Sequence, residues 1–99
     1  MKSKLNSEKI IEKIKKERKK LKIRGVKKIG LFGSFAKGKQ NEKSDIDFLI
    51  EFRKINFENY IYILNLFEKM FGKKVDLVIE ADLKPELRYV KKEAKYVQI

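Results

Sequence analysis

Three aspartates are the residues whose type and spacing first suggest chemistry. Asp45 and Asp47 are separated by one residue at the start of DIDFLIEF, a segment with the composition of a strand. Residues i and i+2 of a strand point to the same side, so we expect the two carboxylates to lie next to each other. Like charges at that separation favour a cation between them, and Mg²⁺ accepts carboxylates together with substrate phosphates. Alone, such a pair is more often a polar strand start that is exposed to water.

Asp76 favours the metal interpretation. It lies inside the apolar segment KVDLVIE, between Val75 and Leu77, where a carboxylate needs a partner. If the two strands are neighbours, Asp76 joins the other two aspartates, and three carboxylates can hold two metal ions for in-line displacement at phosphorus. Asp76 could instead be the general base for an acceptor hydroxyl, or a surface carboxylate paired with a lysine. The chain has no His and no Cys, so catalysis must use carboxylates, lysines, hydroxyls or hard metal ions.

Gly33 and Ser34 follow a predicted strand and precede the start of a short predicted helix. Backbone N–H groups at such a start, with the Ser hydroxyl, form an anion cradle, and glycine lets the backbone approach a phosphate closely. A Gly-Ser pair alone is usually a simple turn. In this chain it begins the run GSFAKGKQNEKSDIDFLI, which also contains the Asp45-x-Asp47 pair with Ser44 directly before it.

This run resembles the signature of the DNA polymerase β-like nucleotidyltransferase superfamily. The resemblance is strongest to the minimal nucleotidyltransferases, small proteins paired with HEPN-domain toxins in toxin–antitoxin systems. Asp76 in KKVDLV matches the third carboxylate of the family, and LKPELRYVKKEAKYV is similar to its last helix, so nearly the whole chain is covered. Lys37 departs from the pattern, because the family usually has Arg there, and Lys lacks the bidentate fork for phosphate. The positions that match the run are Phe35, Ala36, Gly38, Ser44, Asp45, Ile46 and Asp47.

The resemblance implies an enzyme that binds ATP together with two Mg²⁺ ions and transfers the nucleotide to an acceptor. It assigns the catalytic and metal-ligating roles to Asp45, Asp47 and Asp76. It assigns nucleotide binding to Gly33, Ser34, Lys37 and Ser44. The implied acceptor is a tyrosine of a HEPN toxin, which AMP transfer would silence. A non-catalytic antitoxin that blocks its toxin sterically, and a basic nucleic-acid-binding module, remain alternatives.

The elements that must position these residues make a single α/β (α+β) domain over residues 1–99. Helical spacing of apolar residues, with Asn6 or Ser7 as a cap and Gly72 as a stop, predicts three helices. They cover residues 7–21, 57–71 and 85–97, and three strands cover residues 26–32, 45–52 and 74–80. The resemblance implies that these strands form a mixed sheet in the order 1-2-3, flanked by helices.

The segment 57–71 is apolar nearly all round, which predicts burial on more than one side. A domain this small can hardly cover both sides of such a helix. We therefore expect its second face to contact another chain, either the toxin or a second copy in a homo-oligomer.

Charge is concentrated at the two ends of the chain. Residues 1–28 contain 13 Lys or Arg against 3 Asp or Glu, while residues 29–83 contain 8 against 9. The basic end indicates either a polyanionic or acidic partner or a lysine-rich solvated surface, so nucleic-acid binding stays open. No apolar run is long enough to cross a membrane, no signal peptide is visible, and the absence of Cys fits a reducing compartment, so we expect a cytoplasmic protein.

Overall fold

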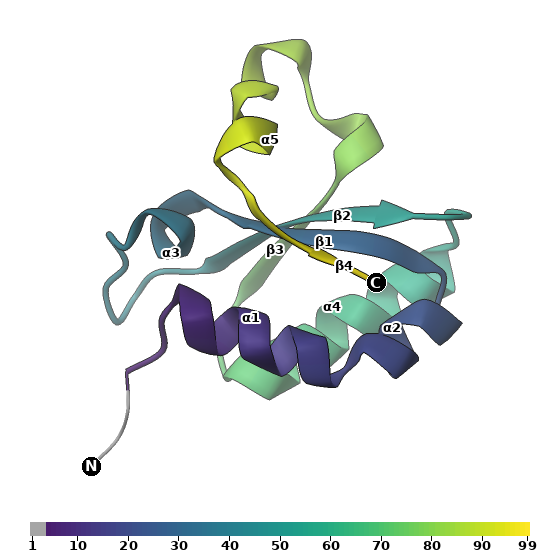
Figure 1. Ribbon diagram of the computed structural model, residues 1–99, viewed down its shortest axis with the longest axis horizontal. Helices are drawn as coiled ribbons and strands as arrows, with labels where there is room; N and C mark the ends of the chain where they lie inside the picture. The colour runs from purple at the N-terminus through teal and green to yellow at the C-terminus, as the bar shows by residue number, and fades with distance from the viewer. Residues whose placement is uncertain (1–3) are drawn as a thin grey trace.

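A computed structural model of the chain describes residues 4–99, which form a four-stranded sheet with helices on both of its faces (Figure 1). None of the helices in this part of the chain is both long and apolar enough to cross a membrane. In chain order, the elements are α1 (Ser7–Lys16), α2 (Arg18–Ile23), β1 (Val26–Phe32), α3 (Gly33–Lys37), β2 (Ile46–Phe52), α4 (Phe57–Phe71), β3 (Val75–Ile79), the 3₁₀ turns η1 (Glu80–Asp82) and η2 (Pro85–Leu87), α5 (Tyr89–Glu93) and β4 (Lys95–Gln98).

The strand order in the sheet is β3-β2-β1-β4. β1 pairs with β2 antiparallel, and β2 pairs with β3 parallel after the chain crosses over through α4. The predicted mixed sheet and its 1-2-3 order are therefore confirmed. The predicted number of strands was wrong, because β4 adds a fourth strand that is antiparallel to β1.

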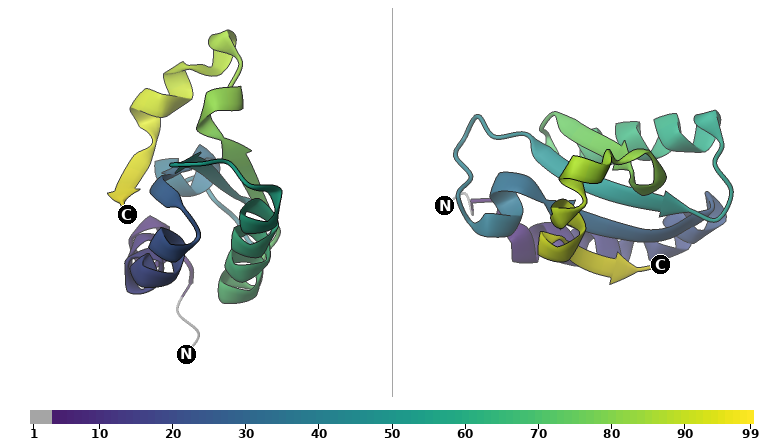
Figure 2. Two further views of the ribbon diagram at one scale, coloured as in Figure 1. Left: turned by 90° about the vertical axis from the view of Figure 1, so that its right-hand side faces the viewer. Right: turned by 90° about the horizontal axis from the view of Figure 1, so that it is seen from above.

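The helix predicted over residues 85–97 was also wrong. The apolar spacing in this segment is helical, but only α5 forms, and the chain becomes extended at Ala94 (φ −68°, ψ 142°). The free edge of β1 offers unpaired backbone groups, and β4 satisfies them. The segment Glu80–Ala94, which we call the arch, therefore rises from the end of β3 and returns to the sheet beside β1, as Figures 1 and 2 show.

The helices α1, α2 and α4 cover the face of the sheet opposite the arch (Figure 2). Asn6 caps α1 by accepting a hydrogen bond from the backbone N–H of Lys9 (3.0 Å), as expected. The predicted first helix is divided at Glu17, so that α2 follows as a separate turn-and-a-half. The core lies between these helices and the sheet and includes Ile10, Ile14, Leu21, Ile29, Leu31, Ile46, Phe48, Ile50, Ile63, Phe67 and Val97.

The helix α4 matches its predicted bounds, and Gly72 ends it in the left-handed conformation (φ 62°). The domain covers more of α4 than we expected. Besides the buried Ile63 and Phe67, six further apolar side chains of α4 pack against the core: Tyr60, Tyr62, Leu64, Leu66, Met70 and Phe71. Phe57, with 75% of its surface exposed, is the large apolar side chain that α4 leaves in solvent. A contact of α4 with another chain stays a prediction.

The packing of β4 onto the core predicts that substitutions at two neighbouring residues change the free energy of unfolding by different amounts. Val97 is buried in the core and Gln98 is exposed, so we expect Val97→Ala to lower the free energy of unfolding by about 1–3 kcal/mol. Gln98→Ala should change it by less than about 0.5 kcal/mol. Urea unfolding of both variants measures the difference. Equal effects would contradict the packing of β4 onto the core.

Candidate active site

The three aspartates lie at one end of the sheet. Asp47 is the second residue of β2 and is in register with Asp76 on β3 and with Phe32 on β1. Adjacent strands are about 4.8 Å apart, so the backbones of Asp47 and Asp76 are direct neighbours. Asp45 precedes β2 by one residue and has the same parity as Asp47. The structure therefore brings the three predicted residues to one sheet end, on the face that the arch partly overhangs.

Gly33 contacts Asp47 directly. It begins α3 immediately after β1 and has a positive φ of 74°, which L side chains rarely adopt. A Cβ placed on Gly33 would overlap the carboxylate of Asp47. The antiparallel register of β1 and β2 thus puts the turn into α3 against this carboxylate. Glycine is needed at this position both for its backbone conformation and for its missing side chain.

The electrostatics of the site show that the carboxylates act on one another. Partial burial raises the pKa of Asp47 from 3.8 to about 6, and the nearby charges of Asp76 and then Asp45 contribute to the rise. Asp45 and Asp76 are themselves exposed. Among residues 4–99, no three acidic, His or Cys side chains already converge closely enough to enclose a metal ion. The site is an accumulation of negative charge in which Asp47 is partly buried and Asp45 and Asp76 are exposed.

Ser34 and Lys37 lie on α3, the short helix that directly follows β1. The Nζ of Lys37 is 3.5 Å from a carboxylate oxygen of Glu93 on α5, and both side chains are about half exposed. Lys37 is therefore held next to the site by a surface ion pair that water screens. Sequence reasoning missed Glu93, because no motif marks it and its place depends on the arch.

Ser44 has a structural role in the loop before β2. Its hydroxyl oxygen accepts a hydrogen bond from the backbone N–H of Asn41 (2.9 Å), and its own N–H donates to the carbonyl of Asn41 (3.1 Å). Lys73 donates to the carbonyl oxygen of Ser44 (3.3 Å). A role of Ser44 in nucleotide binding stays a prediction, since its hydroxyl is already used in shaping the loop.

A cavity of about 490 Å³ opens beside the aspartates, between the sheet end and the arch. Its polar side contains Gly33 and five charged residues: Lys37, Asp76, Asp82, Lys84 and Glu93. Its apolar side includes Val78 of β3 and four residues of the arch: Leu83, Leu87, Tyr89 and Val90. The last three lie in the segment 85–97, for which the sequence predicted a continuous helix, so their place at the cavity was not predicted. Leu87 and Tyr89 are 39% and 55% exposed, so the cavity has apolar side chains at an accessible surface.

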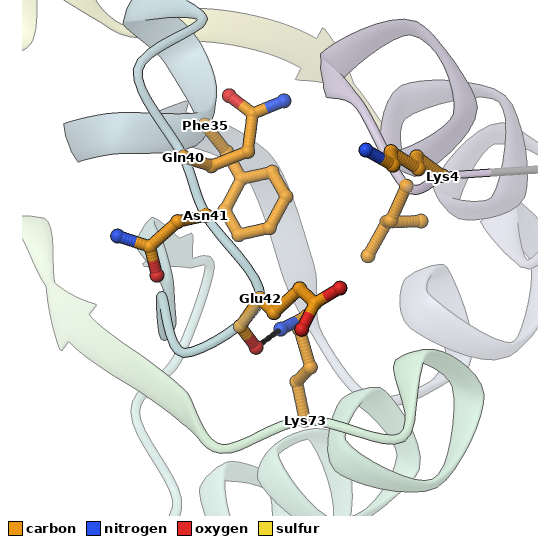
Figure 3. A pocket seen from close by; sticks show the side chains of 7 residues that line it. Lys4, Phe35, Gln40, Asn41, Glu42 and Lys73 are labelled. Carbon is orange, nitrogen blue, oxygen red and sulfur yellow. Dashed lines mark hydrogen bonds between the residues drawn. The ribbon is translucent and has the colours of Figure 1, made fainter.

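A second cavity, of about 470 Å³, lies elsewhere and contains none of the predicted site residues (Figure 3). It is lined by Lys4 and Leu5 before α1, by Phe35 of α3, by Lys73, and by the loop residues 40–42. The Nζ of Lys73, one of these lining residues, donates a hydrogen bond to the backbone carbonyl of Glu42 (2.7 Å). Because Asp76, Gly33 and Lys37 line the cavity beneath the arch, that cavity is the candidate for the reaction site.

A mixed sheet with Gly-Ser after its first strand, Asp-x-Asp on its second and a further Asp on its third defines a nucleotidyltransferase. Comparison with known proteins agrees with this class. The chain belongs to the nucleotidyltransferase domain family, whose family model matches residues 11–97.

Individual relatives and solved structures are similar to this chain over most of its length. The protein adenylyltransferase MntA of Thermococcus cleftensis is 37% identical over 75 residues, which make up 74% of this chain and 76% of that one. A solved structure described provisionally as a minimal nucleotidyltransferase superposes with a TM-score of 0.79 at 28% identity, covering 95% of this chain and 98% of the other. A chain in the complex of tri-AMPylated Shewanella oneidensis HEPN toxin with MNT antitoxin has the same fold, with a TM-score of 0.61 at 20% identity over 88% of this chain and 70% of that one.

The contact between Gly33 and Asp47 predicts unequal costs for two glycine substitutions. Gly33 and Gly38 have similar positive φ angles, 74° and 71°, but nothing lies within 4 Å of a Cβ on Gly38. Ala at Gly38 should cost about 1 kcal/mol of stability from backbone strain alone. Ala at Gly33 should cost about 1–3 kcal/mol more, because Asp47 must move. Urea unfolding compares the two, and equal losses would mean that Asp47 moves aside freely.

The raised pKa of Asp47 predicts a pH-dependent gain of stability in Asp47→Asn. Since the folded protein holds the proton of Asp47 more tightly than the unfolded chain does, the ionised carboxylate lowers stability progressively between about pH 4 and 6. The rise in pKa corresponds to at most about 2–3 kcal/mol, and since the group is only half-buried we expect about 1 kcal/mol.

Thermal or urea unfolding at several pH values measures this gain. Asp47→Asn should be more stable than the parent at pH 7 and equal to it below pH 4. Asp82→Asn, at an exposed position on η1, controls for the general loss of a negative charge. A gain that is independent of pH, or one shared by the control, would show that titration of Asp47 is not its cause.

Proposed function

We propose that this chain is a Mg²⁺-dependent protein adenylyltransferase that transfers AMP from ATP to a tyrosine of a HEPN-domain toxin and so acts as the antitoxin. One observation carries the proposal: Asp47 lies in register with Asp76 and in contact with Gly33, beside an open cavity. The relative MntA carries the name of protein adenylyltransferase, and a tri-AMPylated HEPN toxin is bound to an antitoxin of the same fold. Both support the proposed reaction and acceptor.

The residues fit Mg²⁺ by their chemistry. Carboxylate oxygens are hard ligands, and the accumulated negative charge that raises the pKa of Asp47 would be relieved by a divalent cation. Asp45 and Asp47 would hold Mg²⁺, with Asp76 as a ligand of a second ion or as the general base. When bound, the metal supplies charge neutralisation at the triphosphate.

The reaction requires an acceptor oxygen and the α-phosphorus of ATP in line. The oxygen of the acceptor hydroxyl forms a bond to the α-phosphorus, the bond from that phosphorus to the α–β bridging oxygen breaks, and pyrophosphate leaves. The hydroxyl proton passes to Asp76, if it is the base, or to water. Gly33 and Ser34 would place the triphosphate at the start of α3, where the absent Cβ leaves room next to Asp47.

Lys37 would contact the phosphates in place of the Arg that is usual in the family. Its ion pair with Glu93 has no buried component, so a phosphate can replace Glu93 at little cost. The cavity under the arch would receive the acceptor side chain, because its apolar wall suits a phenol ring and its polar side carries Asp76. Partner recognition would include the exposed Leu87 and Tyr89, and the homo-oligomer through α4 remains a separate prediction.

The test is AMP transfer to a HEPN protein encoded beside this one. Incubating both proteins with ATP and Mg²⁺ should add one or more AMP masses to the toxin in intact mass spectrometry, and a chelator should abolish the addition. Asp76→Ala should slow the transfer on the order of 10²–10⁴-fold while keeping most of the ATP affinity. Lys37→Arg should keep or raise the rate, because it restores a bidentate phosphate contact.

Glu86→Ala is the matched control for Asp76→Ala. Glu86 is an exposed carboxylate of the arch outside the cavity lining, so its removal should leave the rate unchanged. An unmodified toxin that is nevertheless bound and inhibited would overturn the enzymatic function in favour of steric blocking.

A further inference from the structure

The helices α1 and α2 carry a strong excess of positive charge. Between Ser7 and Arg24 the chain has nine Lys or Arg and three Glu. Seven of the cations are exposed: Lys13, Lys15, Lys16, Arg18, Lys19, Lys20 and Lys22. We call this set the basic helix face.

The fold does little to neutralise this charge. Among residues 4–99, Lys20 is the one member of the basic helix face with a carboxylate in reach, Glu17 at 3.6 Å. Arg18 donates to the backbone carbonyl of Gln98 (3.0 Å), and Lys13 lies 5.8 Å from the ring centre of Phe71. By contrast, four lysines of the sheet, α3 and the arch have carboxylate partners: Lys27, Lys28, Lys37 and Lys91. Positive charge gathered on one surface without counter-charges repels itself and attracts a polyanion.

We propose that the basic helix face binds the phosphate backbone of a nucleic acid. The two helices contain 10 and 6 residues and together span roughly 25 Å at about 1.5 Å per residue. Duplex nucleic acid presents about one negative charge per 1.7 Å of its axis, so a regular phosphate array meets many of these cations at once. An acidic protein surface seldom offers charge at that density.

The chemistry of the face also sets the kind of recognition. No aromatic residue precedes Phe32 in the chain, so α1 and α2 themselves carry no ring on which a base could stack. Lysine ammonium groups are point charges that contact phosphates without reading base edges. Binding should therefore be independent of sequence and strongly dependent on salt.

This binding goes beyond the proposed transferase function and is separate from it in space. α1 and α2 lie on the face of the sheet opposite the arch (Figure 2), whereas Asp76 and Lys37 line the cavity beneath the arch. A nucleic acid on the basic helix face would thus not be placed as a template or acceptor for the site. It would hold the protein near RNA or DNA while the cavity stays open.

Fluorescence anisotropy of the full chain with labelled RNA and DNA duplexes of mixed sequence tests the proposal. With about four to five phosphates neutralised, log K should fall with log salt with a slope of about −4. The test variant replaces Lys15, Lys16, Lys19 and Lys22, four exposed residues of the basic helix face, by Gln. It should weaken binding on the order of 10²-fold at low salt and flatten the slope by about 3 units.

The matched control replaces four other exposed lysines, Lys43, Lys54, Lys74 and Lys92, by Gln. It lowers the net charge equally and should weaken binding only a few-fold, and both variants should unfold at the same urea concentration as the parent. Equal losses in the two variants would overturn the proposal, since they would show attraction to net charge alone. Competition by poly-glutamate as strong as that by unlabelled duplex, charge for charge, would overturn it in favour of an acidic protein partner. AMP transfer to the toxin should be unchanged in the test variant. The experiment therefore tests nucleic-acid binding and the transferase function independently.

Discussion

The close approach of Gly33 to Asp47 is the constraint on which the candidate site depends. β1 and β2 are antiparallel, and their register sets Phe32 opposite Asp47. The chain must then turn out of β1 without a steric clash with the carboxylate. Gly33 allows this because it has a positive φ and no Cβ. A slip of one residue in this register would move Asp47 to the core face and the turn away from it. The register in which β1 and β2 pair therefore also determines the geometry of the site.

The same arrangement costs the protein some stability. Asp47 is partly buried between two other carboxylates, so its ionised form is disfavoured in the folded state. The sheet tolerates the cost because its other face is well packed: Phe48, the residue after Asp47, is fully buried with its ring centre 4.9 Å from that of Phe67. Alternation along β2 thus places the disfavoured carboxylate of Asp47 and the stabilising ring of Phe48 at consecutive positions on opposite faces of the sheet.

Most of the helices and strands, and the position of Asp45 and Asp47 at the start of β2, could be predicted because their signals are local. The placement of Asp45 and Asp47 on the same side of a strand, the apolar period of α4 and its stop at Gly72 are all properties of short segments. β4 was missed because its strand conformation depends on distant residues. Tyr96 lies across Gly30, whose missing side chain leaves room for the ring, and its hydroxyl donates to Glu80 (3.3 Å). Neither Gly30 nor Glu80 is close to Tyr96 in sequence, so no pattern within residues 85–98 could indicate the pairing.

The arch carries two carboxylates, Glu80 and Glu93, whose ion pairs differ in their exposure to water. At the start, the carboxylate of Glu80 is only 11% exposed and interacts with Lys28 (3.5 Å) and Lys91 (3.9 Å). At the end, Glu93 of α5 is joined to Lys37 by a pair that is open to water. Ion pairs of the second kind contribute little to stability, whereas removing one partner from the first would leave a poorly solvated charge. A phosphate at Lys37 would compete with Glu93 and not with the Glu80 cluster. Because Lys91 joins α5 to Glu80 and β4 follows α5 onto the sheet, α5 would keep these attachments when a phosphate takes the place of Glu93 at Lys37.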